Sequence, residues 1–272
     1  MSTTIIAFLA IASYAASGIV ISVRLFHEKT ETNIPRPVGI GLGLAGVLLH
    51  GTILYQGIIS DSGINLGFYA AFSLIAWSIL LLLMLSAVTK PVENLGIFLL
   101  PLAILSILLE MHFSTAHLFP ADASWGLRVH VLISLLAYSL LAMASVQAVL
   151  LAVHDHHLHH RHPGGFIRAL PPLITMETLL FEMIGLGFVL LTIGLISGFI
   201  FLENILIQRL AHKTILSIVA WFVFGTLLWG RFRFGWRGQK ALIWTLIGFV
   251  VLMLAYFGSK FVVEVILGVN AG

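Results

Sequence analysis

Eight apolar segments constrain this chain more than any other feature of its sequence. A helix needs about 20 mainly apolar residues to cross the hydrocarbon core of a bilayer. Segments that reach or approach this length occupy residues 3–23, 38–58, 66–88, 95–110, 128–153, 179–202, 214–230 and 241–263. We therefore predict an all-α fold: a polytopic membrane bundle of about eight helices, forming a single integral membrane domain over residues 1–272.

Two of these segments carry local signals of their own. The first, 3–23, has neither a basic region before it nor a small-residue cleavage site, so we expect a retained helix rather than a signal peptide. The fourth, 95–110, contains Pro101 and ends at Glu110, and we expect Pro101 to interrupt it.

The composition supports the membrane assignment and removes several function classes. Of the 272 residues, 60% are hydrophobic and 9% are charged, too few charges to cover the surface of a soluble enzyme, a secreted domain or a disordered scaffold. There is no cysteine, so disulfides, thiolate chemistry and covalent attachment of haem to this chain are excluded. The 12 histidines are the main remaining metal ligands.

The basic residues predict the orientation of the helices. Four of them, Arg128, Arg209, Lys213 and Lys260, fall on one side of the predicted membrane. The other ten fall in or beside the alternate loops: Arg24, Lys29, Arg36, Lys90, Arg161, Arg168, Arg231, Arg233, Arg237 and Lys240. Because Lys and Arg accumulate on the cytoplasmic side, both termini are predicted to lie outside, which in the inner membrane of a bacterium means the periplasm. Cations spread in this way indicate contact with membrane lipid, not with nucleic acid.

His50 is the deepest ionisable residue in the predicted spans. Gly43, Gly46, His50 and Gly57 share one helical face, which permits a close approach of neighbouring helices around the imidazole. A histidine at this depth needs a partner or a cavity. Three roles remain open from the sequence: a hydrogen bond to a neighbouring helix, ligation of haem or another metal, and a proton relay.

A second group of polar residues surrounds the predicted outer loop between the fourth and fifth spans. It consists of Glu110, His112, His117 and His130, and His130 begins a stripe with Ser134 and Tyr138 at intervals of four residues. The stripe runs from the loop into the bundle. Imidazoles here suit haem iron, zinc or copper, or simple contact with headgroups and water.

Two further segments are rich in histidine or charge. Residues 154–162 contain six histidines in a predicted inner loop, 154–178, which indicates a solvated loop, metal buffering or pH-dependent attraction to anionic lipid. The outer loop before the seventh span contains Glu203, Arg209, His212 and Lys213, and interfacial anchoring and ligand binding are both open. The sequence contains no nucleophile elbow, Walker loop or paired outer carboxylates, so we assign no catalytic residue.

Four ordered motifs lie between about residues 125 and 260. They are Trp125 to His130 followed by Leu135 to Tyr138, then Leu170 to Leu173 with Met176 and Glu177, then Gly187 to Gly198, and finally Gly235 to Gly238 with Ala255 to Gly258. In this order they resemble the CcsA/CcmC/CcmF superfamily of cytochrome c assembly proteins, and within it the YpjD-like branch.

The resemblance implies noncovalent binding of haem b at the periplasmic face. His130 matches the first outer haem histidine of the family, and His50 matches its first histidine within the membrane. His112, His117 and His212 are candidates for a sixth iron ligand. Partners for the haem propionates are expected among Arg128, Arg209, Lys213 and His212.

The chain also departs from the family pattern. The tryptophan-rich WWD motif, which forms the porphyrin platform in the family, is replaced by residues 202–214 without any tryptophan, and Trp229 and Leu267 stand where two further histidines are expected. Two hypotheses follow: a haem-binding or haem-translocating assembly factor, or a non-enzymatic accessory that has lost the haem site. The second would bind another membrane protein, of cytochrome assembly or ion transport, or an ion.

Overall fold

The computed structural model describes residues 2–26, 34–60, 63–65, 67–113, 118–120, 124–159, 170–201 and 211–258. Among these residues, eight helices are long and apolar enough to cross a membrane. The predicted all-α, polytopic membrane fold with about eight spans is therefore confirmed. The placement of both termini outside stays a prediction.

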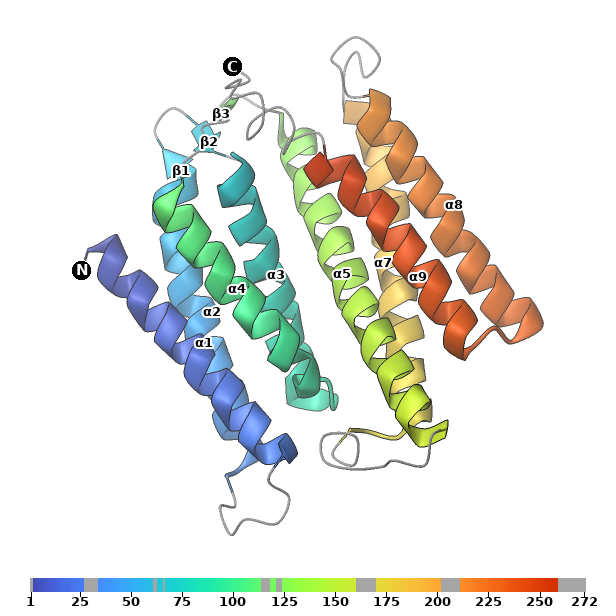
Figure 1. Ribbon diagram of the computed structural model, residues 1–272. Helices are drawn as coiled ribbons and strands as arrows, with labels where there is room; N and C mark the ends of the chain where they lie inside the picture. Colours follow the sequence, from blue (N-terminus) through green and yellow to red (C-terminus); the bar gives the residue numbers. More distant parts are fainter. Residues whose placement is uncertain are drawn as a thin grey trace. The chain divides into compact units, whose positions relative to one another are not determined.

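The chain divides into two compact units, which we call unit 1 and unit 2. Unit 1 contains the helices α1 (Thr3–Phe26), α2 (Arg36–Ile58), α3 (Phe68–Thr89) and α4 (Gly96–His112), with the short 3₁₀ helix η1 (Glu93–Leu95) before α4. Within the unit α1 packs on α2, α2 on α3, α3 on α4, and α4 returns to α1 (Figure 1). Unit 1 is therefore a closed four-helix bundle.

A small antiparallel sheet belongs to unit 1 and was not predicted from the sequence. Its strands β1 (Ile59–Ser60), β2 (Gly63–Asn65) and β3 (Leu118–Pro120) follow in the order β1-β2-β3. Ile59 pairs with Ile64, and Gly63 pairs with Pro120. The sheet thus joins the connection between α2 and α3 to the chain that follows α4.

Pro101 does not interrupt the fourth span, so this prediction was wrong. Helix α4 runs without a break from Gly96 to His112, with Pro101 in its sixth position and on its exposed side. A proline removes one backbone hydrogen bond and clashes with the preceding turn in water-soluble helices, but membrane helices tolerate it when local adjustments satisfy the freed carbonyl group.

Unit 2 contains α5 (Trp125–His159), α7 (Leu173–Phe201), α8 (Ala211–Phe234) and α9 (Gly238–Met253), which continues as the π-helical turn η2 (Leu254–Gly258). Helix α5 packs on α7 and α9, and α8 packs on α7 and α9. Unit 2 is a second closed four-helix bundle, and its antiparallel helices bring the start of α5, the end of α7 and the start of α8 to the same end.

Helix α5 is longer than the sequence predicted. It has 35 residues, about 52 Å at the α-helical rise, whereas the hydrocarbon core is about 30 Å thick. The helix therefore continues through His159 where a loop was predicted from residue 154. His154 is buried, with Nδ1 3.3 Å from the Sδ atom of Met176 on α7. The interpretation of residues 154–162 as a solvated loop is wrong for His154.

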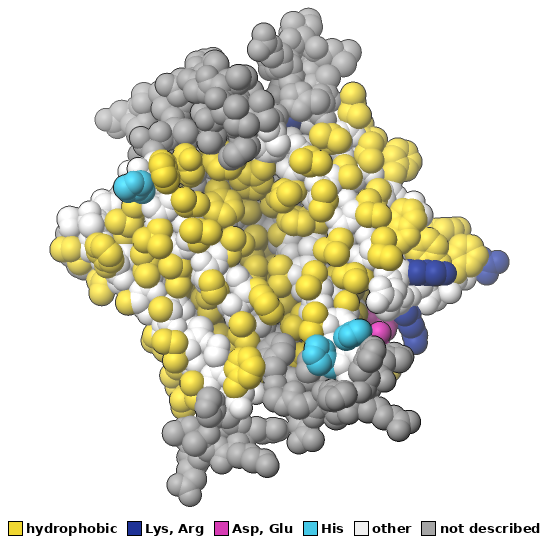
Figure 2. All heavy atoms as spheres, viewed as in Figure 1, with side chains coloured by type: hydrophobic (Ala, Val, Ile, Leu, Met, Phe, Trp, Pro, Cys, Tyr) yellow, Lys and Arg dark blue, Asp and Glu magenta, His cyan; other side chains and the backbone are white. Residues whose placement is uncertain are grey.

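The surface over the helices is largely apolar, as Figure 2 shows for one face. Large side chains such as Leu48, Ile174 and Phe232 are among the most exposed residues in the described part of the chain. Small residues such as Ala10, Ala103 and Ala144 are fully buried instead. Apolar side chains that face lipid and small residues at helix contacts are the pattern of a membrane bundle.

Candidate functional site

His130 lies in the second turn of α5 and is tied to α7 by its imidazole. Its Nδ1 atom is 3.0 Å from Oγ of Ser197, and the Ser197 hydroxyl donates a hydrogen bond of 2.9 Å to the carbonyl oxygen of Gly194. With the hydroxyl proton donated to Gly194, the Ser197 oxygen can accept from an Nδ1–H group of His130. In that tautomer the lone pair of the imidazole is on Nε2.

The His130–Ser197–Gly194 chain has the form of a supported metal ligand. Histidines that bind metals usually donate their other ring N–H to a nearby oxygen, which fixes both the tautomer and the ring orientation. His130 is half-buried, so its side chain is neither enclosed in the bundle nor fully exposed. The chemistry of this side chain therefore suits ligation of one metal atom at the end of unit 2.

The stripe predicted along α5 leads from His130 into the bundle. Ser134 is half-buried next to α7, where a Cβ atom added to Gly194 would lie 3.3 Å from the Ser134 Oγ. Tyr138 is buried, and its ring centroid lies 6.2 Å from that of Tyr256 and 5.9 Å from that of Phe257. The predicted inward direction of the stripe is confirmed.

The motifs that carry the family resemblance contact one another within unit 2. The motif around His130 meets the motif that contains Ser197, and Tyr138 meets the π-helical turn η2 through Tyr256 and Phe257. The Glu177 carboxylate pairs with Arg231, and it lies 3.5 Å from Nε of Arg237. Residues distant in sequence thus form one connected framework.

Two of the cationic candidates, Arg128 and Lys213, lie at the same end of unit 2 as His130. Arg128 is exposed in the first turn of α5, and Lys213 is half-buried in the first turn of α8. His212 also belongs to the first turn of α8, but its side chain is outside the described residues, as are the whole of His117 and Arg209. Among the candidates in the described part of unit 2, Arg128, His130 and Lys213 therefore lie at the same end of the bundle.

His112 and His50 belong to unit 1. His112 is exposed at the end of α4, where its ring lies edge-on to Phe113 with centroids 5.0 Å apart. His50 is completely buried in α2 and contacts two helices: Nδ1 is 3.2 Å from the Tyr14 hydroxyl on α1, and Nε2 is 2.8 Å from the Ser73 hydroxyl on α3. Ligation of iron by His50 would require one of these two hydrogen bonds to break.

The glycines on the His50 face permit these contacts. A Cβ atom on Gly46 would overlap the ring of Tyr14, and one on Gly43 would overlap Sδ of Met84. The predicted close helix approach around His50 is confirmed, and the predicted hydrogen bond to a neighbouring helix becomes two hydrogen bonds, one on each side. Tyr14 and Ser73 were not identified from the sequence, because nothing in the pattern shows which neighbouring hydroxyl reaches a buried imidazole.

Replacing Gly46 with alanine is expected to destabilise the protein by about 1–3 kcal/mol, the usual cost of an overpacked core position. The added methyl group would push Tyr14 away from His50. Gly41→Ala is the matched control, since a Cβ atom at this exposed position of the same helix has no neighbour within 4 Å. Thermal unfolding in detergent compares the two variants; equal midpoints would contradict the packing described here.

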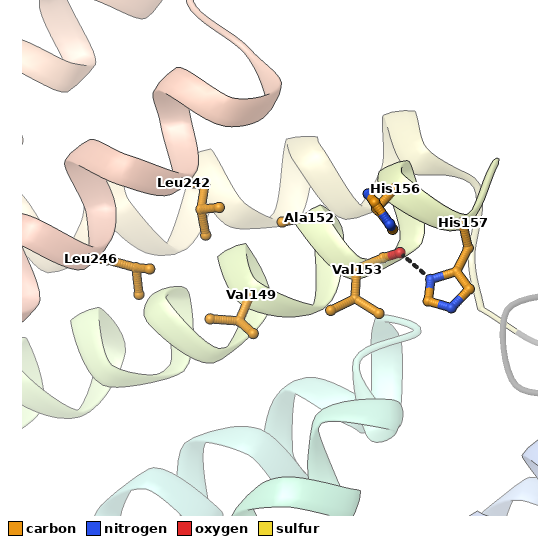
Figure 3. Close-up of a pocket in the computed structure, with 7 residues that line it drawn as sticks. All are labelled: Val149, Ala152, Val153, His156, His157, Leu242 and Leu246. Carbon is orange, nitrogen blue, oxygen red and sulfur yellow. Dashed lines mark hydrogen bonds between the residues drawn. The ribbon is translucent and has the colours of Figure 1, made fainter. Parts of the chain in front are cut away.

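A shallow pocket lies between α5 and α9 near the far end of α5 from His130. It encloses about 340 Å³. Figure 3 shows the lining side chains, with the hydrogen bond between Nδ1 of His157 and the carbonyl oxygen of Val153 as a dashed line of 2.8 Å. The lining residues are Val149, Ala152, Val153, His156, His157, Leu242 and Leu246. The rise of the helix separates His157 from His130 by about 40 Å, so the pocket is not part of the His130 site.

Among the described residues, no group of three or more His, Cys, Asp or Glu side chains could hold a metal ion. Within that part of the chain, a metal at His130 would rely on this one imidazole and on ligands of the bound molecule itself, such as the four nitrogens of a porphyrin.

Comparisons with known proteins show which sequences this chain is similar to. The inner membrane protein YpjD of Escherichia coli is 31% identical over 268 residues, covering 96% of this chain and 99% of YpjD. A 28.8 kDa protein of Azospirillum brasilense is 33% identical over 71% of this chain and 73% of its own length. The cytochrome c biogenesis protein CcsA of Chlamydomonas reinhardtii is 28% identical over 85% of this chain and 67% of its own. No solved structure matches.

The family model for the cytochrome C assembly protein matches residues 41–267. This range begins well before the motif-based resemblance at about residue 125 and therefore takes in most of α2, with α3 and α4 of unit 1, as well as unit 2. Because the match covers most of the chain, this multi-pass membrane protein belongs to the cytochrome C assembly protein family.

Proposed function

We propose that the protein is a bacterial inner-membrane protein that binds haem noncovalently through His130 and takes part in the handling of haem during cytochrome assembly. The family assignment supports a role in cytochrome assembly. The name of the YpjD relative supports a location in the inner membrane, and the name of the CcsA relative supports a role in cytochrome c biogenesis. The observation that supports His130 as the ligand is the His130–Ser197–Gly194 chain, which engages Nδ1 of a half-buried imidazole and leaves Nε2 to bind iron.

Haem b fits the chemistry of this end of unit 2. The macrocycle is planar and apolar, it accepts an axial imidazole, and its two propionates need cations at the membrane edge. His130 would supply the imidazole, while Arg128 and Lys213 lie in the first turns of α5 and α8 at the same end. Bound in this way, the haem would be exposed at the predicted periplasmic face, where a partner of the assembly pathway could accept it.

The second candidate function is a non-enzymatic accessory without haem. Two observations favour it: residues 202–214 lack the tryptophans of the family platform, and both ring nitrogens of His50 are already engaged by Tyr14 and Ser73. Such a protein would use the same fold to hold another membrane protein of cytochrome assembly or ion transport.

The absorbance spectrum of the purified protein separates the two functions. After expression with ample haem, the protein in detergent is expected to show a Soret band, together with haem extractable in acid acetone because no cysteine attaches it. A colourless protein that also fails to bind added haemin would contradict the haem proposal and leave the accessory function.

A further inference from the structure

The turn between α8 and α9 has a defined conformation. The Gly235 amide donates to the carbonyl oxygen of Arg231 at 3.1 Å, and the Trp236 amide donates to that of Gly230 at 3.2 Å. Gly235 has φ +66° and Gly238 has φ +53°, values that favour glycine. A Cβ atom on Gly230 would overlap the Trp236 ring, so this ring lies directly on the helix end. The backbone of the turn therefore has a defined conformation, which sets the positions from which its side chains extend.

Positive charge is in excess at this turn. Arg231, Arg233, Arg237 and Lys240 lie within ten residues of one another. The acidic group placed against them is Glu177 of α7, which pairs with both Arg231 and Arg237. The four cations thus outnumber the two carboxylates of α7, Glu177 and Glu182. In Figure 2 most of the Lys and Arg side chains in view gather at this end of α8 and α9.

Three basic side chains of the turn, Arg233, Arg237 and Lys240, are open to solvent. Arg36 in unit 1 uses its Nε and Nη2 atoms within the protein, where they donate to both Glu93 oxygens and to the carbonyl oxygens of Ala87 and Lys90. The side chain of Arg237 is instead 66% exposed, with Nε 3.5 Å from Glu177. Arg233 and Lys240 are exposed as well. Donors for a further anion are therefore available at the turn.

Aromatic side chains stand beside these cations. Trp229, Phe232 and Phe234 are 63%, 85% and 69% exposed, and the Lys240 ammonium lies 5.8 Å from the centroid of the Trp236 ring. A free phosphate ion or an acidic peptide would use the cations only. A phospholipid would use both, because its headgroup carries the negative charge and its glycerol and acyl regions contact apolar rings at the membrane interface.

We propose that this turn is a binding site for one anionic phospholipid. Arg233, Arg237 and Lys240 contact the headgroup phosphate, while Phe232 and Phe234 contact the lipid chains. Arg231 stays on Glu177 and holds the turn to α7. The site is independent of haem and therefore of the proposed function.

Native mass spectrometry of the full-length protein, titrated in detergent with phosphatidylglycerol or phosphatidylcholine, tests the site. The wild-type protein is expected to prefer phosphatidylglycerol. The double variant Arg233→Gln/Arg237→Gln is expected to bind it about 25-fold more weakly, at the contribution that two basic residues make near an anionic surface. Arg233→Lys/Arg237→Lys keeps both charges and is expected to retain most of the binding.

The matched control is Arg24→Gln/Lys90→Gln, which removes the same charge from the ends of α1 and α3. It is expected to keep wild-type affinity for phosphatidylglycerol. Equal weakening by both double variants would overturn the site, because only net charge would then matter. Displacement of the lipid by millimolar inorganic phosphate would also overturn the proposal, since the turn would then recognise phosphate alone. A thermal unfolding midpoint within error of wild type ensures that each variant is folded.

Discussion

A His130→Ala variant is expected to lose the Soret band that we predict for the wild-type protein. Among the side chains of unit 2 that the structure describes, His130 is the only histidine at this end of the bundle, and its Nδ1 atom is held by Ser197. Loss of an outer-shell partner alone typically lowers metal affinity about 10- to 100-fold, so loss of the ligand itself should cost about 100-fold or more. Absorbance spectroscopy of protein titrated with haemin measures the change.

His157→Ala is the matched control for this variant. His157 lies on the same helix, is exposed, and hydrogen-bonds the carbonyl oxygen of Val153 at the far end of α5. Its replacement is expected to leave the spectrum unchanged. Ser197→Ala should give an intermediate affinity, because the imidazole remains but its orientation and tautomer are no longer fixed. A Soret band of full intensity in His130→Ala would show that iron is held elsewhere.

Among single replacements of partly exposed charged residues, Glu177→Ala is expected to lower the stability of the protein most. The carboxylate joins α7 to the turn between α8 and α9 by pairing with Arg231 and Arg237. Arg231 also lies 4.6 Å from the Phe181 ring centroid, where a guanidinium without its counter-ion is poorly solvated. Breaking a buried pair costs about 3–5 kcal/mol, and because both arginines are partly exposed we expect about 2 kcal/mol here.

Thermal or denaturant unfolding in detergent measures this loss, and Glu182→Ala is the control. Glu182 is on the same helix but is exposed, so its removal should change stability by less than about 1 kcal/mol. Glu177→Gln should recover only part of the stability, since the amide keeps a hydrogen-bond acceptor without the charge. An unfolding midpoint of Glu177→Ala equal to that of the wild type would show that the contacts of Glu177 with Arg231 and Arg237 do not stabilise the protein.

The spans could be predicted because the bilayer imposes a length and a composition on each helix. The inward face of His50 followed from the spacing of Gly43 and Gly46, since small residues at these intervals allow close packing on any neighbour. The end of α5 could not be predicted in this way. Hydropathy predicts where the apolar segment ends, at residue 153. Helix α5 continues beyond that residue to His159.

The candidate site was predictable only in part. The position of His130 followed from its motif and its stripe, but its tautomer depends on Ser197, which lies 67 residues further along the chain. The pairing of Glu177 with Arg231 and Arg237 is equally non-local. These contacts depend on how α5, α7, α8 and α9 close into a ring, and no local pattern in the sequence encodes that arrangement.

Chemical rescue of a cavity variant tests the central claim most directly. In His130→Gly, the missing imidazole leaves space at the end of α5 for free imidazole to replace it as an iron ligand. The absorbance spectrum of this variant with haemin is predicted to lack the wild-type Soret band and to regain it on addition of millimolar imidazole, with no such response from His157→Gly. A His130→Gly spectrum identical to wild type without imidazole, or one that imidazole leaves unchanged, would contradict the assignment of His130 as the haem ligand.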